Sequence, residues 1–415
     1  MPERATPAPS ARLEAAVSPD PSRTGLLLVG VRGAIATTVL HGLESIRAGL
    51  PACGLVTETT AFRGNNWEDL TRFHISGWDI GGDAHRTAED LARIGVLPQD
   101  LVELTAGLRE RLEHAVAPGL PEPEDAQLVQ GESADRLLLS LPEAVEALRG
   151  DIRNWRKQEG YRRCVVVYLA TAERERELPA GWSHPEADPM ELLNDAPRDL
   201  SRSILYALAA ILEGVPFINF TPAPGGAVPA VAGFAQRMGV PLLGNDGKTG
   251  ETLVKTVLAP MFRDRGLNVM AWEGYNMLGN KDGAALADPK RASGKLKNKD
   301  AVLHDILDNE RMHSGVRIDF VPSLHDHKTA MDFIHFEGFL GSRMQLQFTW
   351  QASDSALAAP LVLDLARIAL RAQERGEGGP LRAAASFFKS PLEVRDHDFH
   401  RQMELLREWC AHEED

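Results

Sequence analysis

The chain has 415 residues, 43% of them hydrophobic and 25% charged, and a formal net charge of -14 at pH 7. This length and composition suit a globular protein with two domains, and the acidic balance argues against nucleic acid or an anionic membrane as the main partner. The three cysteines fit neither a disulfide framework nor a zinc site, and no apolar run of the signal-peptide or membrane-spanning kind occurs, so we expect a cytoplasmic protein.

The first half of the chain alternates between predicted strands and predicted helices. Residues 1–24 are rich in Pro, Ala and Ser and are predicted to form a disordered lead-in. Apolar runs and helical spacings then predict a strand at 25–30, a helix at 36–48, a long excursion at 51–133, a helix at 151–158, a strand at 163–171, a helix at 201–213 and a strand at 215–220. This alternation predicts an α/β fold with a Rossmann-like, doubly wound parallel sheet over residues 25–250.

The pattern changes after residue 250. Strand-like segments at 316–321, 332–340 and 344–351 are separated by hairpin-like gaps, and they predict a separate mixed or antiparallel sheet. Residues 353–372 have the pattern of a long helix that returns toward the first domain. We therefore expect a second, α+β domain at 251–352 and a C-terminal segment at 353–415 that packs back onto the first domain.

The motif GVRGAIA at 30–36 follows the first strand and opens the first helix, where a dinucleotide-binding loop is expected. Gly30 permits the tight turn, and Gly33 lets the backbone approach a pyrophosphate. Arg32 stands where a glycine is usual, so it fits either a contact to the pyrophosphate or a 2′-phosphate and NADP. Loops of this kind also occur in proteins that bind no dinucleotide.

The segment 290–299 reverses the sign of the chain's charge. It contains Lys290, Arg291, Lys295, Lys297 and Lys299 and no acidic residue. Neighbouring cations repel one another unless an anion lies among them, and ammonium groups bind phosphate oxygens by charge-assisted hydrogen bonds. This segment therefore predicts either a phosphate-binding site or a solvated basic loop.

Several motifs extend this interpretation across the chain. They are GWDI at 77–80, LATAERE at 169–175, GNDGKTGET at 244–252, YNMLGNKDG at 275–283, SDSALAAPLVLDLA at 353–366 and SFFKSPL at 386–392. In sequence and in order they resemble the inositol-phosphate synthase family, and the resemblance covers residues 25–392. It implies an isomerase of the intramolecular lyase type that converts D-glucose 6-phosphate to 1D-myo-inositol 3-phosphate, in inositol and phospholipid biosynthesis, with a tightly held NAD.

The resemblance also implies roles for individual residues. Lys295 matches the proton carrier of the hydride steps at C5, and Lys389 matches a lysine at the aldehyde oxygen. Asp354 matches a carboxylate that orients a lysine and substrate hydroxyls, and Asp246 one that orients a catalytic lysine. Lys299, Lys328 and Ser355 are assigned to the substrate phosphate, with Lys328 also counted among the catalytic residues. Any one of these lysines taken alone is better explained as a solubilising surface residue.

The cofactor is expected to lie along the ends of the first-domain strands. The residues assigned to it are Gly30, Arg32, Gly33, Ala34, Ile35, Ala36, Asp79, Ala170, Thr171, Ala172, Asp246, Thr249, Asn280 and Asp282. Asp79 matches an acid on the adenosine ribose and favours NAD, because a carboxylate there repels a 2′-phosphate. The motif LHDHK at 324–328 fits a metal site or loop histidines, and no metal ligand is assigned, although the resemblance admits a monovalent or divalent cation.

The resemblance implies a homo-oligomer, with a tetramer expected, that assembles through the second domain. Two alternatives remain open on the sequence. The first is a related cyclase that acts on another sugar phosphate or yields another inositol stereoisomer, because GVRGAIA, NFTPAPGG at 219–226, GNKDG and WQASDS depart from the family pattern. The second is an NAD-dependent oxidoreductase that releases reduced cofactor.

Overall fold

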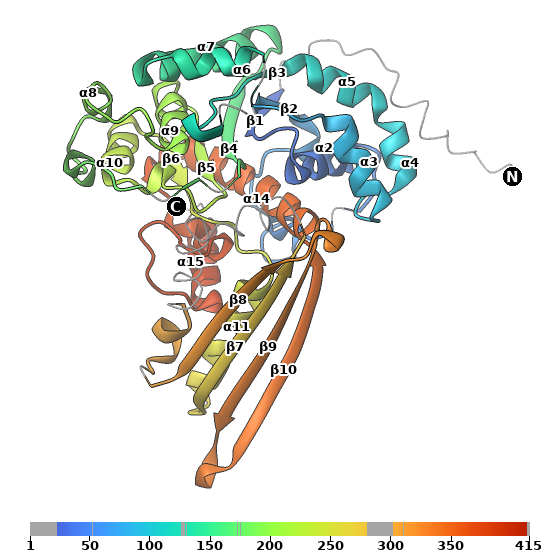
Figure 1. Cartoon of the computed structure of the whole chain (residues 1–415), viewed down its shortest axis with the longest axis vertical. Coiled ribbons are helices and arrows are strands. Elements are labelled where there is room, and N and C mark those ends of the chain that lie inside the picture. The colour runs from blue at the N-terminus through green and yellow to red at the C-terminus, as the bar shows by residue number, and fades with distance from the viewer. Residues whose placement is uncertain are drawn as a thin grey trace, which may run out of the picture.

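The computed structural model describes residues 23–412, apart from 52, 126–128, 130, 172, 175, 280–301 and 310. Two β-sheets organise these residues. A seven-stranded sheet is flanked by helices, and a four-stranded sheet projects away from it (Figure 1).

The seven-stranded sheet contains β1 (Thr24–Val29), β2 (Phe73–Asp79), β3 (Val116–Pro118), β4 (Arg163–Tyr168), β5 (Phe217–Asn219), β6 (Pro241–Leu243) and β11 (Gly379–Pro380). Its order is β11-β6-β5-β4-β1-β2-β3, and all neighbouring strands are parallel. From β3 to β6 this is the Rossmann strand order, which reverses between β1 and β4. The predicted fold class is therefore confirmed.

The central strands β1, β4, β5 and β6 are buried on both faces, which explains their continuous apolar sequences. In β1, Leu26 and Leu28 face one core, whereas Leu27 and Val29 face the other. The second core is covered by α7 (Leu141–Gln158), α9 (Arg202–Leu212) and α10 (Pro229–Met238).

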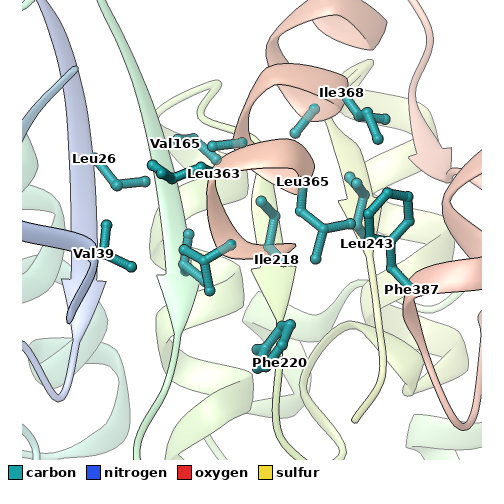
Figure 2. Packing of buried hydrophobic residues seen from close by; sticks show 14 of the residues in the cluster. Leu26, Val39, Val165, Ile218, Phe220, Leu243, Leu363, Leu365, Ile368 and Phe387 are labelled. Carbon is teal, nitrogen blue, oxygen red and sulfur yellow. The ribbon is translucent and has the colours of Figure 1, made fainter. Parts of the chain in front are cut away.

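The first core is covered by α2 (Ala34–Arg47) and by α14 (Asp354–Glu374), which comes from the C-terminal part of the chain. Figure 2 shows Leu363, Leu365 and Ile368 of α14 beside Val165 and Ile218 of the sheet. The predicted helix at 353–372 corresponds to α14.

The four-stranded sheet contains β7 (Asn268–Leu278), β8 (His313–Phe320), β9 (His327–Glu337) and β10 (Arg343–Ser353), in the order β10-β9-β7-β8. β9 is antiparallel to both of its neighbours, whereas β7 and β8 are parallel, so the expected mixed sheet is confirmed. Its inner face packs on α11 (Glu251–Asp264) and on the helical residues 302–307, through a core that includes Phe262, Trp272 and Ile334. The tip of this sheet lies far from the first sheet (Figure 1).

The remaining helices are α3 (Ala84–Arg93), α4 (Gln99–Leu104), α5 (Ala106–Ala115), α6 (Glu132–Asp135), α8 (Pro189–Leu192) and α15 (Phe399–Ala411). Some element predictions are wrong. The excursion at 51–133 contains β2 and β3, and β7 is a strand that the apolar pattern does not predict. The helix expected at 151–158 begins at Leu141, where Ser140 and Glu143 form a capping box. The strand expected to reach residue 340 ends at Glu337, because Leu340 has a positive φ in the hairpin that follows.

Candidate functional site

A cavity of about 630 Å³ lies at the carboxyl ends of β1 and β4, where the strand order of the first sheet reverses. Its walls come from the loop after β1, from α3, from residues 246–249, from the start of β9 and from the first turn of α14. Both sheets therefore contribute to one cavity, with a glycine-containing loop in one wall and two lysines, Lys328 and Lys389, in another.

The loop after β1 has the backbone geometry of a phosphate-binding turn. Gly30 adopts a φ of 88°, which disfavours any side chain, and its amide donates to Trp78 O at 2.8 Å. Gly33 is the N-cap of α2 and provides no side-chain acceptor, so the first amides of this helix are left for an anion. The cavity is lined by the predicted residues Gly30, Gly33, Ala34, Ile35, Ala36, Ala170 and Thr171.

Asp79 and Arg32 support this loop from outside the described lining of the cavity. Asp79 Oδ2 accepts the Arg32 amide at 2.8 Å, and its Oδ1 accepts the amides of Ile80 at 2.9 Å and Gly81 at 3.2 Å. Burial raises the pKa of Asp79 against the effect of these hydrogen bonds. The Arg32 guanidinium pairs with Glu113 at 2.6 Å, so its charge is matched within the protein.

Lys389 and Asp246 form an ion pair in the wall of the cavity. Lys389 Nζ lies 2.8 Å from Asp246 Oδ1, although 143 residues separate them in the chain. Backbone hydrogen bonds hold the two segments together: Lys389 N donates to Asp246 O at 2.7 Å, and Lys248 N donates to Phe387 O at 2.8 Å. The two predicted residues are thus brought together by two loops at the edge of the first sheet.

Lys328, Asp354 and Thr249 form a second polar cluster in the same cavity. Lys328 Nζ forms an ion pair with Asp354 Oδ1 and donates to Thr249 Oγ1 at 3.1 Å, and Thr249 donates to Asp354 at 3.0 Å. Lys328 is the second residue of β9 and Asp354 is the first residue of α14, so the four-stranded sheet and the helix that follows it each contribute one member of the pair. The lysine passes close to the backbone of Gly250, where a Cβ atom would lie 2.9 Å from Lys328 Cε.

Asp326 orders the first turn of α14, beside this cluster. Its Oδ2 accepts the Ser355 hydroxyl at 2.7 Å and the Ser355 amide at 3.2 Å, and burial raises its pKa. Ser355, which is predicted to bind phosphate, therefore lines the cavity with its hydroxyl and amide already donating to Asp326. Asp326 is a cavity residue that the sequence interpretation does not assign to the substrate or cofactor.

A further lysine, Lys248, is buried next to these loops with only 2% of its surface exposed. Its Nζ donates to Gln402 Oε1 of α15 at 2.6 Å. Burial, together with a smaller effect of the Lys389 charge, lowers the pKa of Lys248 to about 7. No sequence signal separates this buried lysine from the lysines that line the cavity.

Five predicted site residues lie outside the described residues: Ala172, Asn280, Asp282, Lys295 and Lys299. Sequence reasoning also missed one wall of the cavity, which is formed by α3 and includes Arg86, Thr87, Asp90 and Arg93. The only local signal there is Asp83, which caps α3 by accepting the His85 amide at 2.7 Å.

The motif at 324–328 does not assemble metal ligands. Asp326 is turned toward Ser355, and His327 Nε2 lies 3.2 Å from Ile94 O. No cluster of three or more His, Cys, Asp or Glu side chains suited to an ion occurs among the residues that the structure describes. In the same part of the chain, no helix is both long enough and apolar enough to span a bilayer.

Comparison with known sequences relates this chain to one enzyme family. Residues 250–355 match the family model described as myo-inositol-1-phosphate synthase. Inositol-3-phosphate synthase 1 of Bacteroides thetaiotaomicron is 33% identical over 95% of this chain and 94% of its own length. Inositol-3-phosphate synthase isozyme 1 of Arabidopsis thaliana is 32% identical over 73% of this chain and 61% of its own length.

Solved structures agree at the level of the fold. Inositol-3-phosphate synthase from Caenorhabditis elegans superposes with a TM-score of 0.81 at 24% identity, over 95% of this chain and 86% of its own. A myo-inositol-1-phosphate synthase-related protein from Thermotoga maritima gives a TM-score of 0.75 at 23% identity, over 94% of this chain and 98% of its own.

Proposed function

The chain belongs to the myo-inositol-1-phosphate synthase family, and we infer from this membership that it acts as an inositol-3-phosphate synthase. It converts D-glucose 6-phosphate to 1D-myo-inositol 3-phosphate, which is an isomerase reaction of the intramolecular lyase type. The observation that carries the inference is the convergence, in one cavity, of a Rossmann phosphate loop with the Lys389–Asp246 and Lys328–Asp354 pairs.

We propose that the cofactor is NAD. The fit rests on the positive φ of Gly30 and on the uncapped first turn of α2, which suit a pyrophosphate. The salt bridge between Arg32 and Glu113 supports NAD over NADP, because this guanidinium is already matched by a carboxylate. When bound, NAD supplies reversible hydride acceptance to the reaction.

In the proposed mechanism, Lys389 stabilises and protonates the aldehyde oxygen at C1 when the ring closes. Asp246 Oδ1 holds the Lys389 amine at 2.8 Å and fixes its direction. A paired ammonium of this kind gives a developing oxyanion a positioned cation, because the backbone hydrogen bonds of both loops hold it in place before the reaction.

Lys328 is proposed to bind the substrate phosphate and Asp354 to orient substrate hydroxyls. Their ion pair keeps the lysine beside Thr249, just before α11, where the Thr249 hydroxyl accepts from Lys328 Nζ at 3.1 Å. Lys295 and Lys299 keep their proposed roles as proton carrier at C5 and phosphate ligand, and Asn280 and Asp282 keep theirs near the nicotinamide.

The test is incubation of the pure protein with glucose 6-phosphate and sub-stoichiometric NAD, followed by phosphorus NMR and by the absorbance of reduced nicotinamide. A new inositol-phosphate resonance without lasting reduced cofactor is expected. Lasting reduced cofactor would instead indicate a simple oxidoreductase. An unchanged substrate would indicate a cyclase for another sugar phosphate.

We also propose that the chain forms a homo-oligomer, with four copies, through the outer face of the four-stranded sheet. Met331 and Phe333 of β9 are 46% and 37% exposed on this face. Their cross-strand partners on β10, Thr349 and Gln347, are uncharged. β10 is also an edge strand of 11 residues, and a long edge of this kind favours pairing between chains.

Light scattering after size exclusion tests this assembly. The double variant Met331→Lys/Phe333→Lys is expected to give a smaller species, because it puts two charges onto the buried face of the assembly. Leu138→Lys, at a residue 77% exposed in the first domain, is the matched control and should leave the mass unchanged. An unchanged mass in the double variant would contradict the proposed interface.

We propose that each of the three predicted segments of the chain has its own role. Residues 25–250 hold the cofactor, residues 251–352 contribute catalytic residues and the oligomer interface, and residues 353–415 return to the first sheet with Asp354 and Lys389. A reducing, cytoplasmic location is proposed from the low cysteine content.

A further inference from the structure

His325 has a backbone conformation that disfavours every residue except glycine. Its φ is 51° and its ψ is -120°, at the end of the turn that leads into β9. A side chain in this region of φ and ψ is strained, and such residues persist only where their surroundings impose the conformation.

Hydrogen bonds before and after His325 in the chain impose this backbone conformation. Before it, Val321 N donates to Leu278 O at 2.8 Å, and His325 N itself donates to Pro322 O at 3.1 Å. After it, Asp326 O accepts the amide of Asp354 at 3.1 Å. Gly279 passes so close that a Cβ atom on it would lie 2.3 Å from His325 N. The turn is therefore fixed between the end of β7 and the start of α14, whichever residue stands at 325.

Nothing within the described part of the chain compensates this strain through the imidazole. The His325 ring has no hydrogen bond or ion pair there, whereas the neighbouring His327 contacts Ile94 O at 3.2 Å. His325 is exposed and lines the cavity, three residues before Lys328. The two cavity lysines, by contrast, are each paired with a carboxylate. An imidazole can both donate and accept, which suits the oxygen atoms of a sugar phosphate.

We propose that His325 is a substrate-contacting residue that hydrogen-bonds an oxygen of the sugar phosphate in the part of the cavity next to Lys328 and Asp354. The inference deepens the proposed function and rests on it. Glycine would adopt the backbone conformation of this turn at lower energy, so we infer that the histidine is retained for a contact made only when substrate is bound. Strained residues of this kind gather at ligand sites.

The test separates strain from function with two variants. His325→Gly relieves the strain and removes the imidazole, so it is expected to raise Tm while the KM for glucose 6-phosphate rises about tenfold, as for loss of one hydrogen bond to an oxygen left unpaired. Leu340→Gly is the matched control, because Leu340 also has a positive φ (60°) but lies 89% exposed in the hairpin at the far tip of the sheet. It should raise Tm and leave KM unchanged.

Binding without turnover gives a second readout. In calorimetry, His325→Gly should raise the Kd for inositol 3-phosphate about tenfold and leave the Kd for NAD unchanged. Unchanged KM and Kd in an active His325→Gly enzyme would overturn the inference. So would a fall in both Tm and substrate affinity, because that result assigns His325 a structural role. Failure of the proposed function gives a different result: the wild-type protein would then neither turn over glucose 6-phosphate nor bind inositol 3-phosphate.

Discussion

Replacement of Lys248 should change how the stability of the protein depends on pH. Lys248 is 2% exposed, and its amine donates to the neutral amide oxygen of Gln402 at 2.6 Å. Burial lowers the pKa of this lysine from 10.5 to about 7. The folded chain therefore binds fewer protons than the unfolded chain between these pH values, and its free energy of unfolding rises with pH across that window.

The magnitude follows from proton linkage. For a folded pKa of about 7 and an unfolded pKa of 10.5, the lysine adds about 2 kcal/mol to the free energy of unfolding between pH 7 and pH 8.5. Below pH 7 the full cost of burying the charged amine is present. Lys248→Met has no such group and should lack this gain.

Urea-induced unfolding of both proteins at pH 7 and pH 8.5 provides the assay, read by tryptophan fluorescence and circular dichroism where the two transitions coincide. The difference between the two proteins cancels most other titrating groups. Two neighbouring groups interact with Lys248 through their charges: Lys389 contributes to the lowered pKa of Lys248, and Lys248 contributes to the lowered pKa of His397.

Gln402→Glu supplies a second, independent variant. A carboxylate at this position would keep Lys248 charged in the folded state and should also remove the gain at pH 8.5. Equal pH dependence in the wild type, Lys248→Met and Gln402→Glu would refute the reasoning, because it would mean that Lys248 does not lose its proton in the folded protein.

Three further predictions concern the cavity and the second sheet. Lys389→Met should lower kcat about 10²- to 10⁴-fold with little change in the Kd for NAD, which steady-state kinetics and calorimetry can check together; an unchanged kcat would remove Lys389 from its role. Gly30→Ala should weaken NAD binding and lower the free energy of unfolding by about 1 kcal/mol or more, because φ at this position is 88°; equal affinity by calorimetry would contradict the phosphate-loop assignment. Gly274→Ala should lower Tm, at a cost of about 2 kcal/mol, because its Cβ would lie 2.3 Å from Glu251 Oε1 and 2.9 Å from Lys255 Nζ. Gly150→Ala in α7, where no atom lies within 4 Å of the added carbon, is the matched control and should not lower Tm.

The sequence alone determined the elements that are apolar on both faces. β1, β4 and β5 read as continuous hydrophobic runs because a parallel sheet covered by helices buries every residue of its central strands. The sequence did not predict β2 and β3. β3 is a short strand at the edge of the sheet. β2 mixes buried and half-buried positions, so its pairing with β1 decides its structure more than its own apolar pattern does.

The candidate site also combines features that could be predicted from the sequence with features that could not. The phosphate-loop motif predicted Gly30 and Gly33, and the family resemblance predicted Asp246, Thr249, Lys328, Asp354 and Lys389; all seven line the cavity. The pairing of these residues could not be predicted, since Lys389 meets Asp246 across 143 positions. The ion pair between Arg32 and Glu113 and the burial of Lys248 under α15 could not be predicted either.

What the sequence determined by itself is the fold class, because the spacing of apolar residues is a local pattern, whereas the kind of chemistry was inferred from the resemblance of several motifs to one enzyme family. Only the tertiary structure decided which charges neutralise each other, which lysines are buried, and that His325 has a backbone conformation suited to glycine. These properties arise from contacts between segments distant in the chain, and the free energy of a charge depends on such contacts more than on its neighbours in sequence.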